Sequence, residues 1–165
     1  MKRSWKIFLI IALLGIVSPF IWISYFVVAN EAPIIIGEVI RNIEYKDGQE
    51  LDIYTPTQQV FNHSPVILYI HGGAWIGGSK ETINLNRYNQ AVKMLREKVY
   101  SVVSINYTLA ENGKSPFPGC IDDAYDAVKW IHQHADTFHF DTNNIGLFGE
   151  SAGAQIAMMM AFTSD

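Results

Sequence analysis

The sequence holds a single cysteine, few charges and no basic cluster beyond its first residues. With Cys120 alone, neither an internal disulfide nor a metal site of several thiolates can form within the chain. The 12 basic residues are outnumbered by 16 acidic ones, and the net charge of −4 argues against a nucleic-acid partner. Because 49% of the residues are hydrophobic and only 17% are charged, the chain is not disordered, and its 165 residues suit one modest domain.

The longest hydrophobic stretch lies at the N-terminus. Residues 1–6 form a basic end, and residues 7–28 are uncharged. A helix of about 20 apolar residues is long enough to cross a bilayer. We therefore predict a transmembrane signal-anchor at 7–28 and a linker at 29–37, with a secretory signal peptide as the alternative. In both interpretations the basic end stays in the cytoplasm, so we expect the rest of the protein to be extracytoplasmic, either membrane-anchored or secreted.

The segment 149–153 reads Gly-Glu-Ser-Ala-Gly and stands between two apolar segments. Residues 144–148 predict a short buried strand, and residues 154–160 predict a helix that is apolar nearly all round and therefore buried. A G-x-S-x-G motif in this strand–turn–helix context is typical of a nucleophile elbow, in which the turn exposes the Ser151 hydroxyl. The N–H of Ala152 then lies at a helix N-terminus, where unpaired donors favour negative charge, so we predict that it forms half of an oxyanion hole.

A second glycine-rich motif follows another predicted strand. Residues 65–70 are continuously apolar, as expected of a strand covered on both faces, and His71, Gly72 and Gly73 come directly after them. Adjacent glycines let the backbone approach a ligand, and their N–H groups can point at an anion, as in the HGGG-type loops of lipases and esterases. We expect His71 to brace this loop through hydrogen bonds and not to act as the catalytic base. The alternative for both motifs is a glycine-rich turn without a catalytic role.

The remaining pattern predicts an α/β domain over residues 38–165. Two alternating segments about an Asp-Gly turn predict an antiparallel hairpin, and the later alternation of strands and helices predicts parallel strands with right-handed crossovers. A polar turn is predicted at 141–144. The predicted elements, in chain order, are strands at 39–45, 51–55, 65–70, 100–107 and 144–148 and helices within 82–98, 119–135 and 154–160.

Histidines cluster near the end of the predicted helix at 119–135. His132 and His134 are two positions apart, so their side chains point in different directions on a helix. A metal site there would need His139 or Asp141 as well, and we instead expect a solvated helix end and no metal or other cofactor.

Taken together, the motifs resemble a known family. His-Gly-Gly-Ala-Trp at 71–75 precedes the serine motif at 149–153, and Asn-Tyr-Thr-Leu-Ala at 106–110 and an Asp-Asp-rich segment at 122–130 stand between them. In this order they resemble α/β-hydrolases of the hormone-sensitive-lipase-like esterase group, close to bacterial carboxylesterases. The resemblance implies the N-terminal half of an α/β-hydrolase fold, a mostly parallel sheet with an antiparallel hairpin and helices on both faces, here preceded by one transmembrane helix.

The resemblance also implies a reaction. Ser151 would be the nucleophile, and the N–H groups of Gly72, Gly73 and Ala152 would stabilise the oxyanion while a small carboxylic ester is hydrolysed through an acyl-enzyme. The chain departs from the family pattern after Tyr107, where relatives often carry arginine and proline, which leaves the conformation of that loop open.

The triad partners of the serine are the missing part. In this fold they follow the nucleophile in the order Asp or Glu, then His. No histidine follows Ser151, and Asp165 stands too close to it to be the usual acid. We therefore expect residues 38–165 to be a truncated domain that is inactive alone and lacks a C-terminal half as its partner. The alternatives are a peptidase or arylformamidase of the same fold, or a non-catalytic membrane-anchored binding protein.

Overall fold

The computed structural model describes Ser18, Ile21 and residues 38–163. Apart from Ser18 and Ile21, the predicted transmembrane segment at 7–28 lies outside the described residues. The predicted linker at 29–37 lies outside them as well. Across the residues that it does describe, no helix combines the length and the apolar composition needed to cross a membrane.

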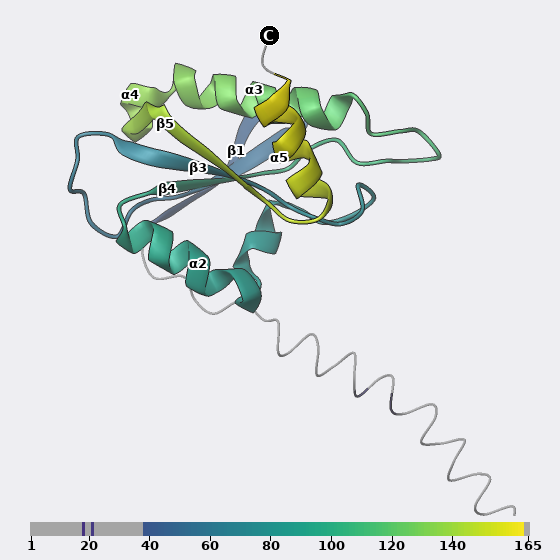
Figure 1. Cartoon of the computed structure of the whole chain (residues 1–165), viewed down its shortest axis with the longest axis horizontal. Coiled ribbons are helices and arrows are strands. Elements are labelled where there is room, and N and C mark those ends of the chain that lie inside the picture. The colour runs from purple at the N-terminus through teal and green to yellow at the C-terminus, as the bar shows by residue number, and fades with distance from the viewer. Residues whose placement is uncertain (1–17, 19–20, 22–37, 164–165) are drawn as a thin grey trace, which may run out of the picture.

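A five-stranded mixed sheet forms the centre of the domain (Figure 1). Its strands are β1 (Val39–Lys46), β2 (Gln49–Tyr54), β3 (Ser64–Ile70), β4 (Ser101–Ile105) and β5 (Phe140–Gly149). They lie in the order β1-β2-β4-β3-β5. β1 pairs antiparallel with β2 and β2 antiparallel with β4, whereas β3 runs parallel to both β4 and β5. The predicted antiparallel hairpin and parallel strands are confirmed.

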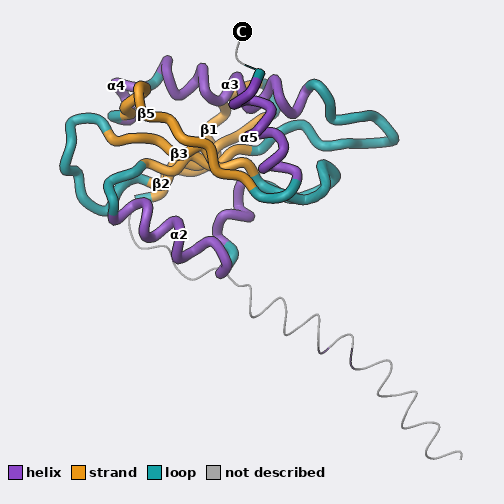
Figure 2. Tube along the Cα trace, viewed as in Figure 1, coloured by secondary structure: helices purple, strands orange, loops and turns teal. Residues whose placement is uncertain are grey.

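Helices cover both faces of this sheet. They are the 3₁₀ helix η1 (Lys80–Asn84) and the α-helices α2 (Asn86–Glu97), α3 (Gly119–Gln133), α4 (Ala135–Phe138) and α5 (Ala152–Phe162). In Figures 1 and 2, α3, α4 and α5 lie above the sheet and α2 lies below it. The described part of the chain therefore has the predicted α/β layout.

The alternation of side chains along the strands builds a separate core on each face. Leu68 and Ile70 of β3 belong to the larger core, which includes residues of α3 and α5. Tyr69, between them, belongs to the smaller core with Val92 of α2 and Val102 of β4. Since neighbouring residues of a strand point to opposite faces, a strand covered on both sides is expected to be apolar on both, as residues 65–70 of β3 are.

β5 is longer than predicted. It begins at Phe140 and so includes residues 141–144, which were predicted as a turn. The ladder with β3 explains the difference, because Pro65 pairs with Asp141 and the next pair on β5 uses Ile145. The turn-forming residues are thus accommodated as an irregularity inside the strand.

The outer face of α5 is exposed. Although the helix is apolar nearly all round, Met158 is 56% exposed and Phe162 84% exposed, so the prediction of a fully buried helix is wrong for this face. β5, which leads into α5, is the last strand in the sheet order, and among the described strands none pairs with its outer edge.

Candidate active site

Ser151 occupies the sharp turn between β5 and α5. Its backbone has φ 52° and ψ −117°, which is costly for a residue with a Cβ atom. The turn is closed by hydrogen bonds from the N–H of Gly153 to Glu150 O at 2.8 Å and from the N–H of Gln155 to Ser151 O at 3.1 Å. The serine is exposed and its hydroxyl does not cap the helix, so the strained turn presents it to solvent.

The two glycines of the motif are required by close packing. A Cβ atom on Gly149 would overlap the carbonyl oxygen of Gly153. A Cβ atom on Gly153 would overlap the carbonyl oxygens of Ile70 and His71. The first contact closes the turn on itself, and the second seats it against the end of β3, where the other glycine motif begins.

The structure brings the two motifs together. We call residues 71–79, between β3 and η1, the glycine loop. A Cβ atom placed on Gly72 of this loop would lie 3.4 Å from the Cβ of Ser151 and 2.9 Å from the carbonyl oxygen of Glu150. Parallel strands bring their carboxyl ends to the same edge of the sheet, and this explains why motifs so distant in sequence meet.

The N–H groups predicted to form the oxyanion hole are not used by the fold. Within residues 38–163, no backbone–backbone hydrogen bond outside the regular elements has the N–H of Gly72, Gly73 or Ala152 as its donor. Ala152 is the first residue of α5, where the N–H groups of a helix lack partners in the preceding turn. These N–H groups therefore remain available, with Gly72 and Ala152 next to Ser151, although their catalytic role stays a prediction.

His71 braces the glycine loop, as predicted. Its Nδ1 donates a hydrogen bond to Gly72 O at 2.7 Å, and its ring stacks on Tyr107 with 4.3 Å between centroids. The Tyr107 hydroxyl donates to His71 O at 2.8 Å. Burial lowers the pKa of His71, with the hydrogen bond to Gly72 opposing that shift. A neutral imidazole fixed by these contacts supports the loop.

Glu150, the neighbour of Ser151, contacts a residue that the sequence did not single out. Its Oε1 lies 3.2 Å from Nη2 of Arg87 on α2. Its Oε2 is buried and has no hydrogen-bond partner among the described residues. Burial, and next the charge of Glu150, raise the pKa of Tyr69 on the adjacent strand. Only tertiary packing places Arg87 here, since it lies on a separate helix.

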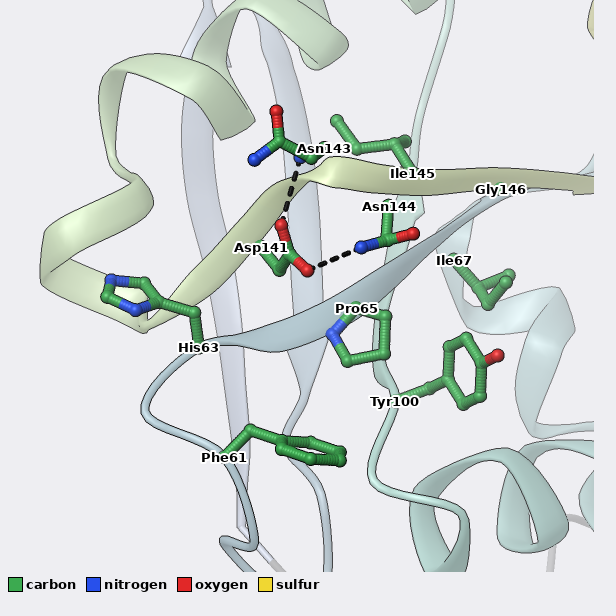
Figure 3. Close-up of a pocket in the computed structure, with 10 residues that line it drawn as sticks. All are labelled: Phe61, His63, Pro65, Ile67, Tyr100, Asp141, Asn143, Asn144, Ile145 and Gly146. Atoms are coloured by element: carbon green, nitrogen blue, oxygen red, sulfur yellow. Dashed lines mark hydrogen bonds between the residues drawn. The ribbon is translucent and has the colours of Figure 1, made fainter.

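A cavity of about 620 Å³ lies away from these motifs (Figure 3). It opens at the amino-terminal end of β3 and beside the irregular part of β5, where Asp141 accepts hydrogen bonds from Asn143 and Asn144. Its lining residues are Phe61, His63, Pro65, Ile67, Tyr100, Asp141, Asn143, Asn144, Ile145 and Gly146. Because Ser151 and the glycine loop lie at the carboxyl ends of the strands, this cavity is not the candidate active site.

His134, at the end of α3, has structural contacts, whereas His132 is exposed. Nδ1 of His134 donates to Trp130 O at 2.8 Å, and the two rings stack at 4.1 Å. Over the part of the chain that the structure describes, no group of three or more His, Cys, Asp or Glu side chains is arranged to hold a metal ion.

Known proteins share both sequence and architecture with this chain. The BD-FAE family model matches residues 51–165. Arylacetamide deacetylase of Bos taurus is 35% identical over 128 residues, covering 73% of this chain and 31% of its own length. Carboxylesterase NlhH of Mycobacterium tuberculosis is 34% identical over 102 residues, covering 62% of this chain and 30% of its own length.

Among solved structures, a hyperthermophilic esterase from the archaeon Pyrobaculum calidifontis matches 82% of this chain and 41% of its own, with a TM-score of 0.63 and 31% identity. The chain spans about 30% of the length of these two curated relatives. The matched sequence and the shared fold confirm the resemblance to carboxylesterases that the motifs indicated.

Proposed function

The chain belongs to the BD-FAE family of α/β-hydrolases, and from this premise we propose that it carries the nucleophile and the oxyanion hole of a serine esterase. The observation that carries the proposal is the contact between the two motifs, with Ser151 exposed at a strained turn directly beside Gly72. The names of the relatives, carboxylesterase and arylacetamide deacetylase, support a carboxylic acyl group as the substrate class.

The proposed reaction starts with attack of the Ser151 oxygen on the carbonyl carbon of the ester. The carbonyl oxygen becomes an oxyanion that accepts hydrogen bonds from the N–H groups of Gly72, Gly73 and Ala152. Each such donor is worth about 3 kcal/mol of barrier. Collapse of the tetrahedral species expels the alcohol and leaves the acyl group on Ser151, and water then hydrolyses this acyl-enzyme.

The proton of the serine needs a base that residues 1–165 do not supply. No histidine follows Ser151 in the sequence, and Nδ1 of His71 is engaged with the carbonyl of Gly72. We therefore propose that the imidazole and its acidic partner come from polypeptide beyond these residues, and that the 165-residue chain alone does not turn over esters.

The site would work outside the cytoplasm. The basic residues at 1–6 and the uncharged run at 7–28 support a membrane anchor whose basic end faces the cytoplasm. A protease added to intact cells would then digest residues 38–165, whereas complete protection of that segment would contradict the proposed location.

A thiol nucleophile tests the site without the missing base. A cysteine thiol has a pKa of about 8.5 and is partly ionised at mildly alkaline pH, so Ser151→Cys needs no general base. With p-nitrophenyl acetate its sulfur attacks the carbonyl, a thioester forms at position 151, and one nitrophenolate leaves per chain. We expect this acylation to be about 100-fold faster than that of Gln58→Cys, whose thiol lies on an exposed loop without oxyanion donors.

The rate of nitrophenolate release by the unsubstituted chain is subtracted from both, because the buried thiol of Cys120 is present in every variant. Equal rates for the two cysteine variants would overturn the proposed function.

A further inference from the structure

The glycine loop holds an unfavourable backbone conformation. Gly73 and Gly78 have φ of 130° and 92°, and the non-glycine residues Ala74 and Trp75 have φ of 53° and 60°. Left-handed backbone at a residue with a Cβ atom is costly and persists only where the surroundings impose it. The loop that carries the proposed oxyanion donors must therefore be held by contacts outside itself.

The segment after β4 supplies several of these contacts. The Tyr107 hydroxyl holds the start of the loop through His71 O at 2.8 Å, and the N–H of Ala110 holds its middle through Trp75 O at 2.6 Å. Lys80, the first residue after the glycine loop, is held through both its backbone N–H and its backbone carbonyl. The N–H of Lys80 donates to Asn106 Oδ1 at 2.8 Å, and the Ser104 hydroxyl donates to Lys80 O at 2.7 Å.

The side chain of Lys80 is also fixed, although it carries a charge in the interior. The residue is 1% exposed. Its ammonium donates to Asn42 Oδ1 at 2.7 Å, lies 3.1 Å from Asp52 Oδ1, and bonds Glu81. These acceptors match the three protons of an ammonium. Burial alone lowers the pKa of Lys80, but the bonds to Glu81 and Asp52 outweigh burial and raise it, so the group stays charged.

An irregularity in the β1–β2 hairpin positions two of the acceptors that contact the Lys80 ammonium. The register of the hairpin shifts between Ile40 and Ile43, and Asn42, inside the shift, has φ 57°. This conformation directs the N–H of Asn42 to Asp52 Oδ1 at 2.9 Å while its side chain accepts from Lys80. Asp52 is fully buried, and its other oxygen lies 3.2 Å from Arg41 Nη1. Bulges commonly redirect side chains next to active sites.

We propose that Lys80 is a positioning residue of the catalytic site: by fixing the exit of the glycine loop to the β1–β2 hairpin, it holds the two glycines beside Ser151. The proposal rests on the proposed function, since it concerns the same oxyanion donors. A buried charge pair is expensive to form and gives little net stability, whereas it imposes one geometry on the groups that it joins. That geometry is what a strained loop presenting N–H groups to a developing anion requires.

The test compares two reactions of one thiol in the Ser151→Cys background. Acylation by p-nitrophenyl acetate passes through an oxyanion, whereas alkylation by iodoacetamide does not. Adding Lys80→Met keeps the aliphatic stem and leaves Asp52 paired with Arg41, so we expect the variant to fold. We expect acylation to slow about tenfold with alkylation unchanged, because only the first reaction depends on where the loop N–H groups lie. A merely structural role would change both rates or neither.

Arg41→Met is the matched control. It removes a partner of the same Asp52 carboxylate from the solvent side, where the arginine side chain is 47% exposed. We expect both rates to stay unchanged. Loss of acylation in this control equal to that in Lys80→Met would overturn the specific role of the lysine.

A second variant tests the proposal if Lys80→Met does not unfold cooperatively and is therefore not properly folded. Asn42→Gly keeps the left-handed backbone and removes one acceptor of the ammonium, and we expect acylation to slow about threefold. Unchanged acylation in a folded variant overturns the proposal. Failure of Ser151→Cys itself to exceed Gln58→Cys would instead overturn the proposed function, so the two failures are distinguishable.

Discussion

Arg87 on α2 and Glu150 on the turn between β5 and α5 form an ion pair, with Nη2 of the arginine 3.2 Å from Oε1 of the glutamate. The pair joins the helix below the sheet to the turn that carries Ser151 (Figure 1). The arginine side chain is 52% exposed and that of the glutamate 34% exposed, so solvent screens the interaction. Such a pair is worth at most about 1 kcal/mol.

Arg87→Met should therefore lower the free energy of unfolding by less than about 1 kcal/mol in low salt, and the difference should shrink in high salt. Urea titrations at both ionic strengths measure it. Lys93→Met is the control on the same helix, since Lys93 contacts Glu97 at 3.8 Å, and it should cost about 0.3 kcal/mol. A large, salt-independent loss for Arg87→Met would show that the unpaired oxygen of Glu150 dominates instead.

The second glycine of the serine motif should tolerate no side chain. A Cβ atom at Gly153 would overlap the carbonyl oxygens at the end of β3, and backbone cannot move aside cheaply. We expect Gly153→Ala to destabilise the chain by about 3 kcal/mol in urea unfolding. Gly77→Ala is the matched control, because a Cβ atom there meets nothing within 4 Å, and its effect should stay within about 0.5 kcal/mol. Similar losses for both variants would contradict the close packing of the turn.

Much of the architecture followed from the sequence because the patterns concerned are local. Alternation about the Asp-Gly turn predicted the β1–β2 hairpin, and the continuous apolar run predicted β3 as a strand covered on both faces. The family resemblance carried by the two glycine motifs implied that Ser151 and the N–H groups of Gly72, Gly73 and Ala152 share one site. The first two features depend on residues close in sequence or on a general rule of parallel sheets.

The remaining features depend on which distant segments pack together. No local signal marks Lys80 as buried or pairs it with Asp52, because the bulge of β1 that makes the pairing possible appears only in the register of the hairpin. Arg87 was missed for the same reason. The burial of α5 was overestimated because its composition is apolar on all sides, whereas burial depends on what lies against each side.

Burial of His71 makes the stability of the chain depend on pH. Its pKa is lowered in the folded state, so the unfolded chain binds more protons once the pH falls below about 6.5. The stability from this group is therefore complete above that pH and is lost as the pH falls toward the lowered pKa. We expect the melting temperature to decrease over this window in the parent chain and to decrease less in His71→Asn. Equal slopes in the two chains would contradict this link between His71 and stability.

The loop after β4, where the chain departs from the family pattern, is fixed through a buried carboxylate. Asp123 is 2% exposed and accepts hydrogen bonds from the N–H and the hydroxyl of Thr108 at 2.7 and 2.6 Å. Thr108→Val keeps the shape and removes the hydroxyl bond, so it should cost about 1.5–3 kcal/mol in urea unfolding. Thr57→Val is the control, because Thr57 is an exposed residue whose hydroxyl makes only a 3.5 Å contact, and a matching loss there would contradict the role of Asp123.

The exposed face of α5 should drive association of the chain. Met158 and Phe162 of α5 are 56% and 84% exposed, whereas Met94 on α2, at the opposite face of the sheet, is 54% exposed. An isolated apolar side chain is normal on a surface, but α5 exposes two of them and follows β5, whose outer edge pairs with none of the described strands. Met158→Lys should therefore raise the protein concentration at which light scattering from the chain begins. Met94→Lys adds the same charge and should leave that concentration nearly unchanged. Equal shifts for the two variants would mean that net charge, and not the exposed face of α5, controls association.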